Sequence, residues 1–483
     1  AAAAAAAAGV GGAVLYAEEL TGIIQVGRID ELFQIGSLLG EGGFAMVYSG
    51  KDKKTGKRYA LKIMDKSNPE TPLVMKDEVE VMRAAGVHRN LVCLHGTYET
   101  KGDYILALDL ADGGALFDRV VDEGGLTEVV ASAYVLQVVE AILHMHRRKI
   151  CHGDIKPENL LLTSSDPNAS IKICDFGMAR FIAEGEGLVL NQNTGTMDYW
   201  SPEIVKNARC GQKIDMWALG VVTYIMLCGC NPFDPHGSSS DAEILTSITK
   251  GELDQSNPVW KVLSPACQDL IKGMLTVDPE KRLSADDALA HPWLVGGKAS
   301  GKELPKVHAQ RLLGYQALIR LRNTVKALYI NTDDMFDAFS KEGEIDSVGL
   351  KKAFRNLGSD LTTEGVEAVM EIADVSGDGK IDREEFQGLM KASRQQQGGE
   401  LNDEQLKQLF KLFDENGDGF ISPSEMSHVM GILGRKMSIR RAASIINSEA
   451  AIPSPADGSE KGLTFKEFKQ VMNKNMFESQ KNE

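Results

Sequence analysis

Apolar and polar residues follow two different periods along this chain, and the change between them marks its parts. In Phe33–Asp65 they alternate around a cluster of glycines, which predicts a strand-rich hairpin region. From Glu78 to Leu294 the apolar residues follow helical spacing with turn-rich interruptions. The glycine- and lysine-rich stretch Val295–Lys306 then predicts a domain boundary.

The remainder of the chain has a different pattern. Leucine, isoleucine and valine are interleaved with arginine and lysine in Arg311–Ile330, which predicts a basic amphipathic helix. Thr332–Glu483 holds a weak internal repeat, in which short amphipathic helices flank loops dense in aspartate, glycine and glutamate. We therefore expect a half with catalytic motifs, a basic helix and an acidic repeat half.

Size and charge narrow the possible functions. The 483 residues are too many for one compact core, so two or three domains are expected. The composition, 43% hydrophobic and 25% charged, is that of a globular protein, and a net charge of -15 gives nucleic-acid binding little support. The acidic balance fits either a solvated surface or a set of cation sites, and composition leaves both open.

Cysteine use and hydropathy bear on the compartment. Seven cysteines without a CxxC pair indicate a reducing environment, so we expect a cytoplasmic protein. The longest apolar run, Met216–Cys230, falls short of the roughly 20 residues of a membrane span. It predicts a buried core helix and no transmembrane segment. The opening alanines are treated as a tag or spacer, and membrane association through the N-terminus stays open.

A glycine cluster lies in the strand-rich region. The stretch LGEGGFAMV, Leu39–Val47, places Gly40, Gly42 and Gly43 where backbone amides can approach phosphate oxygens, because no side chain intervenes. Many hairpins hold such a loop, and Ala45 replaces the third glycine of the pattern. The loop alone is therefore a weak indication of a nucleotide site.

A lysine on the next expected strand strengthens this interpretation. Lys62, in YALKI, has the spacing of a clamp for nucleotide phosphates, although a lysine among apolar neighbours is more often a surface residue. The following helix offers Glu78 as its ion-pair partner, with Glu80 as a competitor. The order of glycine loop, lysine and helix favours Glu78.

The stretch CHGDIKPENLLL, Cys151–Leu162, has the spacing of a phosphoryl-transfer loop. Asp154 can accept the proton of an attacking hydroxyl, Lys156 can neutralise the phosphoryl group, and Asn159 can ligate a metal. Asp175, in CDFG, supplies the main magnesium ligand. Phosphoryl transfer needs positioning and charge neutralisation more than covalent chemistry, and these residue types at this spacing provide both.

Three further residues are expected to brace this region. Glu203 in DYWSPE and Arg282 in DPEKRL are predicted to form a buried ion pair, and Asp215 in DMWALG is predicted to hold the catalytic-loop backbone. Each motif alone could arise by chance, but their combined order along the chain could not. The first half therefore predicts a phosphoryl-transfer enzyme.

At these residues the sequence resembles the eukaryotic protein kinases over Phe33–Leu294, with departures at Ala45, Gly153 and Ser201. The lysine of DIKPEN and the GT of TGTMDYW are similar to serine/threonine rather than tyrosine kinases. The end SADDALAHPWL is similar to the calmodulin-dependent kinase group. The resemblance implies ATP and Mg²⁺ as cofactors, and protein substrates that carry serine or threonine.

The resemblance also implies a nucleotide site with Leu108 as gatekeeper and Asp109–Ala111 as hinge. The residues implied to bind ATP are Leu39, Gly40, Glu41, Gly42, Gly43, Val47, Ala60, Lys62, Leu108, Asp109, Ala111 and Leu161. Ala115 stands where kinases that prefer basic substrates carry a glutamate, which leaves such a preference open. Glu158 could supply part of it.

Two loops in the acidic half have EF-hand spacing. DVSGDGKIDREE, Asp374–Glu385, and DENGDGFISPSE, Asp414–Glu425, each combine spaced oxygen ligands, a turn glycine and a closing glutamate. Hard Ca²⁺ needs this many oxygens in a flexible cage, whereas the alternative is two acidic surface turns. The expected Ca²⁺ ligands are Asp374, Ser376, Asp378, Lys380 (carbonyl), Asp382, Glu385, Asp414, Asn416, Asp418, Phe420 (carbonyl), Ser422 and Glu425.

Two further units look degenerate. Phe339–Leu350 has no closing acid at the right place, and Ser454–Phe468 has Ala456, Gly458 and Lys461 where acids and glycine are needed. Because EF-hands work in pairs, each lobe is expected to hold one competent and one structural loop. This predicts two bound Ca²⁺ ions per chain rather than four.

Taken in order, these parts resemble the calcium-dependent protein kinases of plants and apicomplexan parasites. The resemblance implies an α+β bilobal protein kinase fold followed by an all-α EF-hand domain of two lobes. The expected parts are an N-terminal extension, a protein kinase domain, a junction with an autoinhibitory segment, and a calmodulin-like domain with four EF-hand units. They occupy residues 1–32, 33–294, 295–330 and 331–478.

The basic helix in Arg311–Ile330 has two interpretations. It is either a solvent-facing linker or a segment that docks on the kinase cleft at low Ca²⁺ and on the opened EF-hand lobes at high Ca²⁺. Its apolar stripe and basic flank favour the second, which makes this helix an intramolecular partner of a monomeric kinase. The pattern includes Leu312, Tyr315, Ile319, Arg322 and Lys326.

Gly153 determines which form of regulation is expected. Many kinases carry an arginine before the catalytic aspartate, and that buried charge must meet a phosphorylated activation loop. Gly153 carries no charge, so we expect Ca²⁺ to be the switch, without a strict need for phosphate on Thr194 or Thr196. The expected function is a calcium-activated serine/threonine protein kinase.

Two alternatives remain open. A catalytically weak or inactive calcium-responsive pseudokinase scaffold has only Gly153 and Ala45 in its support. A lipid or small-molecule kinase fits poorly with GTMDYWSPE, which is typical of a peptide-binding lip. Transfer of phosphate to a generic peptide separates the first alternative from an active kinase.

Overall fold

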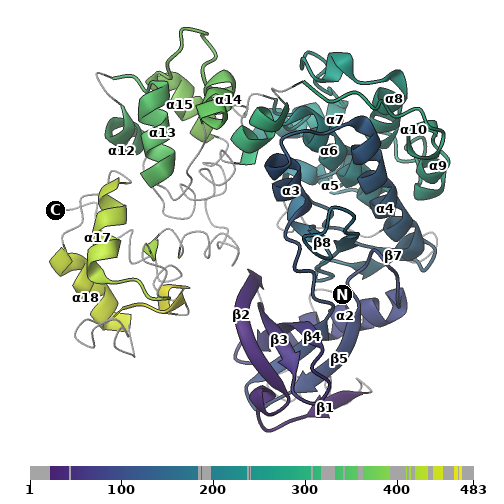
Figure 1. Ribbon diagram of the computed structural model, residues 1–483, viewed down its shortest axis with the longest axis vertical. Helices are drawn as coiled ribbons and strands as arrows, with labels where there is room; N and C mark the ends of the chain where they lie inside the picture. The colour runs from purple at the N-terminus through teal and green to yellow at the C-terminus, as the bar shows by residue number, and fades with distance from the viewer. Residues whose placement is uncertain are drawn as a thin grey trace. The chain divides into compact units, whose positions relative to one another are not determined.

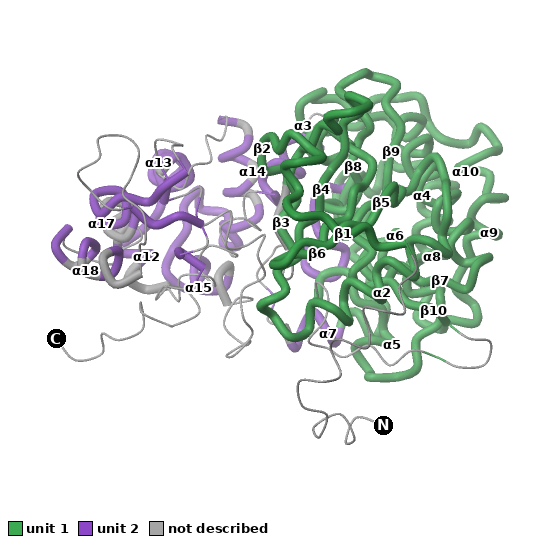
Figure 2. Tube along the Cα trace, turned by 90° about the horizontal axis from the view of Figure 1, so that it is seen from below, with its two compact units in different colours: residues 1–227, 247–305 green, residues 228–246, 306–483 purple. Residues whose placement is uncertain are grey.

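The computed structural model (Figure 1) describes most of the first half of the chain and parts of the acidic half. The chain divides into two compact units, residues 1–227 with 247–305 and residues 228–246 with 306–483 (Figure 2). The described residues are 22–42, 45–182, 187, 197–235, 239, 241–305, 308–316, 332–340, 343–356, 363–391, 410, 413–414, 419–432, 439–449, 462–465 and 467–469.

The first unit opens with a six-stranded sheet in the order β1-β5-β6-β4-β3-β2 (Figure 1). Its strands are β1 (Ile23–Gln25), β2 (Phe33–Gly42), β3 (Ala45–Asp52), β4 (Arg58–Asp65), β5 (Leu94–Glu99) and β6 (Asp103–Leu108). The strand-rich region predicted for Phe33–Asp65 is confirmed as β2 to β4. The sheet also begins before the expected domain start at residue 33, because β1 pairs in parallel with β5.

The register of the sheet gathers the expected nucleotide-site residues on one face. Val47 lies opposite Lys62, and Ala60 lies opposite Leu108. Directly opposed residues share a face of a sheet, and so do residues two apart in one strand. The intervening positions contribute to an apolar core made of Phe33, Leu61, Ile105 and Ala107.

One helix contacts the central strands of this sheet. α2 (Thr71–Ala85) carries Pro72 in its first turn and contacts both β4 and β5. It ends at Gly86, whose φ of +66° is a left-handed conformation that glycine adopts without steric cost. The buried face of α2 includes Glu78.

Helices dominate the chain from Leu116 to Val295. They are α3 (Leu116–Asp122), α4 (Glu128–His146), α5 (Pro202–Val205), α6 (Lys213–Cys228), α7 (Asp241–Lys250), α8 (Pro265–Met274), α9 (Ala285–Leu289) and α10 (Pro292–Val295). α6 is buried over nearly its whole length, which confirms the core helix predicted from its apolar run. Among the described helices α4 alone has the length and hydropathy of a membrane span, and 56% of that window is buried inside the protein.

The stretch expected to be a domain boundary is hydrogen-bonded to the start of α4. The amide of Leu304 donates to the carbonyl of Leu126 at 2.8 Å, and the amide of Val129 donates to the carbonyl of Ser300 at 3.2 Å. The buried carboxylate of Glu128 accepts hydrogen bonds from this segment and from α8 and α10. These bonds keep residues up to 305 with the first unit.

The second unit contains the described helices of the acidic half. They are α12 (Thr332–Phe339), α13 (Ser347–Asn356), α14 (Thr363–Ala373), α15 (Arg383–Lys391), α17 (Pro423–Ile432) and α18 (Ile439–Glu449). Short β-bridges join Ile345 to Ile381 and Ile421 to Leu463. The loops between the helices are therefore paired two by two, as expected for an EF-hand domain of two lobes.

The helix predicted for Arg311–Ile330 is described over its first part. Residues 308–316 are helical and belong to the second unit, and we call them the junction helix. Leu312 in this helix is fully buried, and Leu313 packs against the apolar cluster of the EF-hand helices. The remaining positions of the expected pattern, Ile319, Arg322 and Lys326, lie outside the described residues.

Gly229, which follows α6, lies against the backbone of the junction helix. A Cβ atom at Gly229 would come within 2.5 Å of Arg311 Cβ and 2.8 Å of Leu312 N. The φ of Gly229 is +73°, which also disfavours any larger residue. Glycine at this position is therefore what allows the two segments to approach so closely.

Candidate active site and calcium loops

Lys62 lies in β4 and its ammonium group meets two carboxylates. Nζ is 2.6 and 2.8 Å from the oxygens of Glu78 and 3.2 Å from Oδ1 of Asp175. The competing Glu80 is exposed and lies 3.9 Å from Lys76 instead. Burial alone would lower the pKa of Lys62, but the two carboxylates raise it above its usual value, so Lys62 is charged.

A short hairpin brings the expected metal ligands together. The catalytic loop runs from β7 (Ile150–Cys151) to β8 (Leu160–Leu162), which pairs with β9 (Ile171–Ile173). Asn159 comes just before β8, and Asp175 follows shortly after β9. The amide that precedes Asp175 donates to the carbonyl of Asn159 at 3.0 Å, which fixes the two segments side by side.

The catalytic loop is organised around Asp154. Nζ of Lys156 lies 2.7 Å from Asp154 Oδ2. The side-chain amide of Asn159 donates from Nδ2 to the backbone carbonyl and to Oδ2 of Asp154, at 2.8 and 3.1 Å. The positive charge of Lys62 is the main reason that the pKa of Asp175 falls to about 2. Asp175 therefore stays ionised at neutral pH near the cationic side chains of Lys62 and Lys156.

Asp215, which lies in α6, holds the backbone of the catalytic loop, as predicted. It is 1% exposed and accepts hydrogen bonds from the amides of His152 and Gly153 at 2.9 and 2.8 Å. His146 Nε2 lies 2.9 Å from the same carboxylate. Burial would raise the pKa of Asp215, but the hydrogen bonds and the neighbouring histidines lower it below its usual value.

Two buried contacts stabilise the segments next to the catalytic loop. Arg282 is fully buried, and its guanidinium donates to both oxygens of Glu203 at 2.8 and 2.7 Å, which is the predicted pair. The ring of His152 lies 5.4 Å from the ring of Phe176, the residue that follows Asp175. These contacts hold the segments on either side of the active site.

The structure distributes the remaining expected nucleotide-site residues over four strands of the six-stranded sheet and over β8. Gly43 lies outside the described residues, and Ala111 follows β6 in the hinge segment. The strand residues are Leu39, Gly40, Glu41 and Gly42 in β2, Val47 in β3, Ala60 in β4, Leu108 in β6 and Leu161 in β8. Their role in binding ATP stays a prediction.

The loop Asp374–Glu385 is held by its first and last residues. Asp374 accepts hydrogen bonds from the amides of Gly377 and Gly379 at 2.6 and 2.7 Å. Glu385 accepts one amide bond on each oxygen, from Ser376 at 2.8 Å and from Asp382 at 2.9 Å. The closing glutamate thus reaches both ends of the loop.

The loop Asp414–Glu425 repeats this arrangement where it is described. The amide of Gly419 donates to Asp414 at 2.9 Å, and the amide of Ser422 donates to Glu425 at 2.8 Å. Two expected ligands, Asn416 and Asp418, lie outside the described residues. In the described part of the chain, these two loops included, no three acidic, histidine or cysteine side chains gather as a metal cluster, so the Ca²⁺ ligands stay a prediction from sequence spacing.

The β-bridges align the two degenerate units with the competent ones. Ile345 pairs with Ile381, which is four residues before Glu385, so Gly349 takes the place of the closing glutamate in the first unit. This shifts the first loop by one residue from the expected Phe339–Leu350. In the fourth unit the same count from Leu463 leads to Glu467, which accepts hydrogen bonds from Thr464 as Glu425 does from Ser422.

Comparison with known proteins agrees with this geometry. The family described as "Protein kinase domain" matches residues 33–294. Families described as "EF hand" and "EF-hand domain" match residues 366–390 and 405–434.

Several relatives share most of the chain. Calcium-dependent protein kinase 9 of Arabidopsis thaliana is 34% identical over 374 residues, which cover 73% of this chain and 67% of the relative. Calcium-dependent protein kinase 33 of the same plant is 35% identical over 368 residues, covering 72% and 68%. The chain belongs to the calcium-dependent protein kinase family. Within the kinase domain, Probable serine/threonine-protein kinase pXi of Dictyostelium discoideum is 40% identical over 268 residues, which cover 56% of this kinase and 36% of the relative.

The hinge of this kinase is held by contacts that the sequence analysis missed. The carboxylate of Asp109 accepts a hydrogen bond from the amide of Cys93 at 3.1 Å and lies 2.6 Å from His95 Nε2 and 2.8 Å from Lys172 Nζ. Burial would raise the pKa of Asp109, but these partners lower it to about 2. His95 lies in β5 and Lys172 in β9, so this one carboxylate links the strands on both sides of the hinge.

The backbone conformation, as well as the absence of a charge, explains why glycine stands at position 153, where the kinase motif has an arginine. Its φ is +76°, and a Cβ atom would lie 3.2 Å from the carbonyl oxygen of Met178. Side chains other than glycine adopt this conformation only with strain. In this kinase the catalytic loop therefore takes its shape without an arginine and without that strain.

Proposed function

We propose that this protein is a calcium-activated serine/threonine kinase that transfers the γ-phosphoryl group of ATP to protein hydroxyls. The observation that carries the proposal is the ion-paired Lys62, with Glu78 and Asp175 at 2.6 and 3.2 Å, next to the bonded set of Asp154, Lys156 and Asn159. Lysine, carboxylates and amide in this arrangement supply the charge and the base that phosphoryl transfer requires.

Each residue of this set has a distinct role in the proposal. Lys62, held by Glu78, would fix the nucleotide phosphates, and Asn159 and Asp175 would hold Mg²⁺. When bound, ATP and Mg²⁺ supply the phosphoryl group and much of its charge neutralisation. Asp154 would orient the substrate hydroxyl and accept its proton.

The position of Lys156 suits charge neutralisation. Its ammonium lies 2.7 Å from Asp154, so it stands where negative charge grows as the hydroxyl is deprotonated. Burial would lower the pKa of Lys156, but Asp154 raises it above the usual value, so its charge is retained. The loop is thereby electrostatically prepared before substrate arrives.

Calcium control is the second part of the proposal. Asp374 and Glu385 in one loop, and Asp414 and Glu425 in the other, accept hydrogen bonds from loop amides, which holds the first and last expected Ca²⁺ ligands of each loop in place. The other expected ligands of each loop would complete the Ca²⁺ site: Ser376, Asp378, Lys380 (carbonyl) and Asp382 in the first loop, and Asn416, Asp418, Phe420 (carbonyl) and Ser422 in the second. We expect two Ca²⁺ ions per chain.

The junction helix is the proposed link between calcium and activity. Its Leu313 packs with the EF-hand cluster, while its backbone at Arg311 and Leu312 meets Gly229 after α6. A segment that contacts EF-hand helices can respond to their rearrangement when Ca²⁺ binds. We propose that it restrains the kinase without Ca²⁺ and is released with it.

The remaining assignments follow from the same features. The seven cysteines are free thiols, which supports a reducing cytoplasmic setting. We propose a monomer whose regulatory partner is its own junction helix. The N-terminal residues, through which membrane association was left open, lie outside the described part of the chain.

Phosphate transfer to a peptide library with serine, threonine or tyrosine as the single acceptor tests the catalytic part. The full chain in saturating Ca²⁺ is expected to label the serine and threonine peptides, and Asp154→Asn is expected to lower the rate by about 100-fold or more. No labelling above background by either protein would support the pseudokinase alternative, and equal labelling by the wild type and Asp154→Asn would contradict the role proposed for Asp154.

A further inference from the structure

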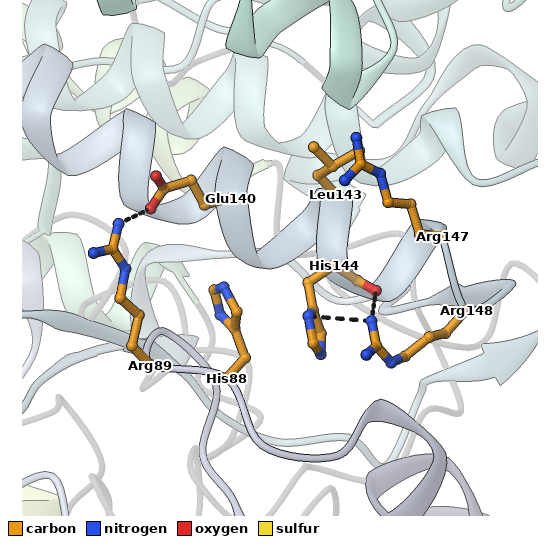
Figure 3. Close-up of a pocket in the computed structure, with 7 residues that line it drawn as sticks. All are labelled: His88, Arg89, Glu140, Leu143, His144, Arg147 and Arg148. Atoms are coloured by element: carbon orange, nitrogen blue, oxygen red, sulfur yellow. Dashed lines mark hydrogen bonds and ion pairs between the residues drawn. The ribbon is translucent and has the colours of Figure 1, made fainter.

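A pocket of about 370 Å³ lies between the loop after α2 and the C-terminal half of α4 (Figure 3). Five of its seven lining residues are basic, and none belongs to the nucleotide or catalytic set described above. The lining residues are His88, Arg89, Glu140, Leu143, His144, Arg147 and Arg148.

Two neighbouring histidine rings lie in this pocket, tilted by 35° to each other, and hydrogen bonds fix their tautomers. The ring centroids of His88 and His144 are 4.6 Å apart. The amide of Asn90 donates to His88 Nδ1 at 3.2 Å, and Arg148 donates to His144 Nδ1 at 3.1 Å. His144 Nε2 donates to the carbonyl of Ala85 at 2.7 Å. Because both Nδ1 atoms accept, the neutral rings carry their protons on Nε2.

The three guanidinium groups are neutralised to different degrees. Arg89 pairs with Glu140, and Arg147 lies 2.8 Å from Asp286 in a pair whose side chains are both largely exposed. Arg148 bonds to a neutral imidazole and a carbonyl, and within the described residues it pairs with no carboxylate. A guanidinium bonded in this way can exchange a neutral acceptor for a charged one, which forms the stronger hydrogen bond.

We propose that this pocket binds a phosphate group, held by Arg147 and Arg148 and by the Nε2–H of His88. The planar fork of arginine matches two oxygens of a phosphate or of a carboxylate, and only a phosphate has a further oxygen left to accept from the Nε2–H of His88. Two of the three guanidinium groups meet a carboxylate, Glu140 or Asp286, so the positive charge of Arg148 is left for an anion to compensate. In the described part of the chain His88 Nε2 has no other partner.

Proton uptake is expected to accompany binding. Burial lowers the pKa of His88, and His144, Arg89 and Lys172 lower it further, while Glu140 opposes them. A bound anion adds negative charge beside the ring and raises the pKa of His88. Affinity is therefore greatest below the pKa of the free pocket and falls as the pH rises through the pKa of the bound one.

Sulfate is the probe for the first experiment, because its double charge stays constant across the neutral pH range. Ring C–H signals of the nine histidines can be followed by NMR in the full chain, with ionic strength held constant by chloride. His88→Asn and His144→Gln assign the two signals, since each keeps the hydrogen bond of one ring nitrogen. Saturable, parallel shifts of both signals, larger at pH 6 than at pH 8, are expected.

Matched arginine variants show whether the pocket is the origin of the shifts. Arg148→Gln is expected to weaken sulfate binding about tenfold or more. Arg147→Gln, at an exposed position, repeats the test without a buried contact. Arg28→Gln, which removes an exposed arginine paired with Asp30, is expected to change nothing. Shifts that do not saturate, or that survive both pocket variants, would overturn the proposal.

A second experiment distinguishes the two sources of the phosphate group. Inorganic phosphate and a phosphoserine peptide are compared with sulfate in the same assay, with the unphosphorylated peptide as control. Tighter binding of the phosphopeptide assigns the pocket to a phosphorylated segment, and equal binding assigns it to a free phosphate. Binding of the unphosphorylated peptide with equal strength would contradict a phosphate site. None of these readouts requires kinase activity, so they stand apart from the proposed function.

Discussion

Gly153 combines two properties that are usually considered separately, the absence of a charge and a left-handed backbone. Its amide donates to the buried Asp215 at 2.8 Å, which requires the φ of +76° that glycine alone adopts freely. An arginine at this position would therefore introduce backbone strain in addition to an uncompensated charge. The sequence showed the missing charge, but only the structure shows the backbone conformation.

The strain can be measured with the smallest side chain. Gly153→Ala is expected to lower the free energy of unfolding of the kinase domain by about 1–2 kcal/mol, because a Cβ atom is disfavoured at this φ. Thermal or denaturant unfolding of the full chain, followed at the kinase transition, measures the loss. Gly102→Ala, in a turn with open space and no positive φ, is the control and is expected to cost less than about 0.5 kcal/mol. Equal effects at the two positions would show that Gly153 is unstrained.

Asp109 provides a second prediction at this scale. Asp109→Asn removes the charge that both His95 and Lys172 contact, so the hinge loses its link to β5 and β9. We expect KM for ATP to rise about three- to tenfold with little change in kcat, because hinge contacts are the same in ground and transition states. Steady-state kinetics with varied ATP provide the measurement.

The control for Asp109 lies in the same segment. Asp112→Asn removes an exposed pair with Arg58 and is expected to leave KM within about twofold. The pKa of Asp109 is about 2, so its bonds are complete above the usual aspartate pKa and are lost only as the pH falls toward 2. A strong pH dependence of the KM difference near neutrality would contradict this account.

The sequence predicted those active-site residues that occur at fixed spacings within short motifs. Lys62, Asp154, Asn159 and Asp175 were found because fixed spacings within short stretches define their chemistry. The partners of Asp109 come from β5 and β9, far apart in sequence and without a motif. No spacing rule connects them before the fold is known.

At the scale of elements, periodicity predicted strands and helices well but not the contacts that the segment after α10 makes. The alternation in β2 to β4 and the apolar run of α6 were read correctly. The hydrogen bonds that tie the glycine-rich stretch to the first unit were not predicted, because the contacts of the buried Glu128 with Ser300 and Trp293 depend on tertiary packing. β1 was not predicted either, because a strand of three residues is too short to show a period.

The junction helix offers a test at this scale through Gly229. Gly229→Ala places a Cβ atom within 2.5 Å of Arg311 Cβ, which the helix can avoid only by moving away. If the docked helix restrains the kinase, activity without Ca²⁺ is expected to rise severalfold while activity with Ca²⁺ stays the same. Peptide phosphorylation in chelator and in Ca²⁺ measures both.

Gly56→Ala is the matched control for this variant. Gly56 has a similar φ of +71°, but its Cβ would meet only Lys51 Cε at 3.8 Å, so it reproduces the strain without the clash. It is expected to leave the ratio of activities unchanged. An equal rise in both variants would mean that general destabilisation, and not the junction helix, releases the kinase.

The closing glutamates allow a count of calcium sites. Calorimetric titration of the full chain with Ca²⁺, at fixed Mg²⁺, is expected to give two equivalents, and Glu385→Gln or Glu425→Gln is expected to leave one. Glu467→Gln is the control, because Glu467 holds the same position in a loop that has Ala456 and Gly458 where oxygen ligands are needed. Loss of an equivalent in Glu467→Gln, or four in the wild type, would contradict the prediction.

In the whole molecule, the junction helix is the proposed connection between the active site and the two EF-hand loops. The family membership, the Lys62–Glu78 pair and the paired EF-hand loops are observed. The direction of control cannot be read from the sequence, because it depends on a free-energy difference between two arrangements and not on the presence of motifs.

A calcium titration of peptide phosphorylation by the full chain tests this account most directly. The rate is expected to rise at least tenfold from chelator to saturating Ca²⁺, and the variant Glu385→Gln/Glu425→Gln is expected to stay at the chelator rate at all Ca²⁺ concentrations. Equal turnover in chelator and in saturating Ca²⁺ would contradict the account.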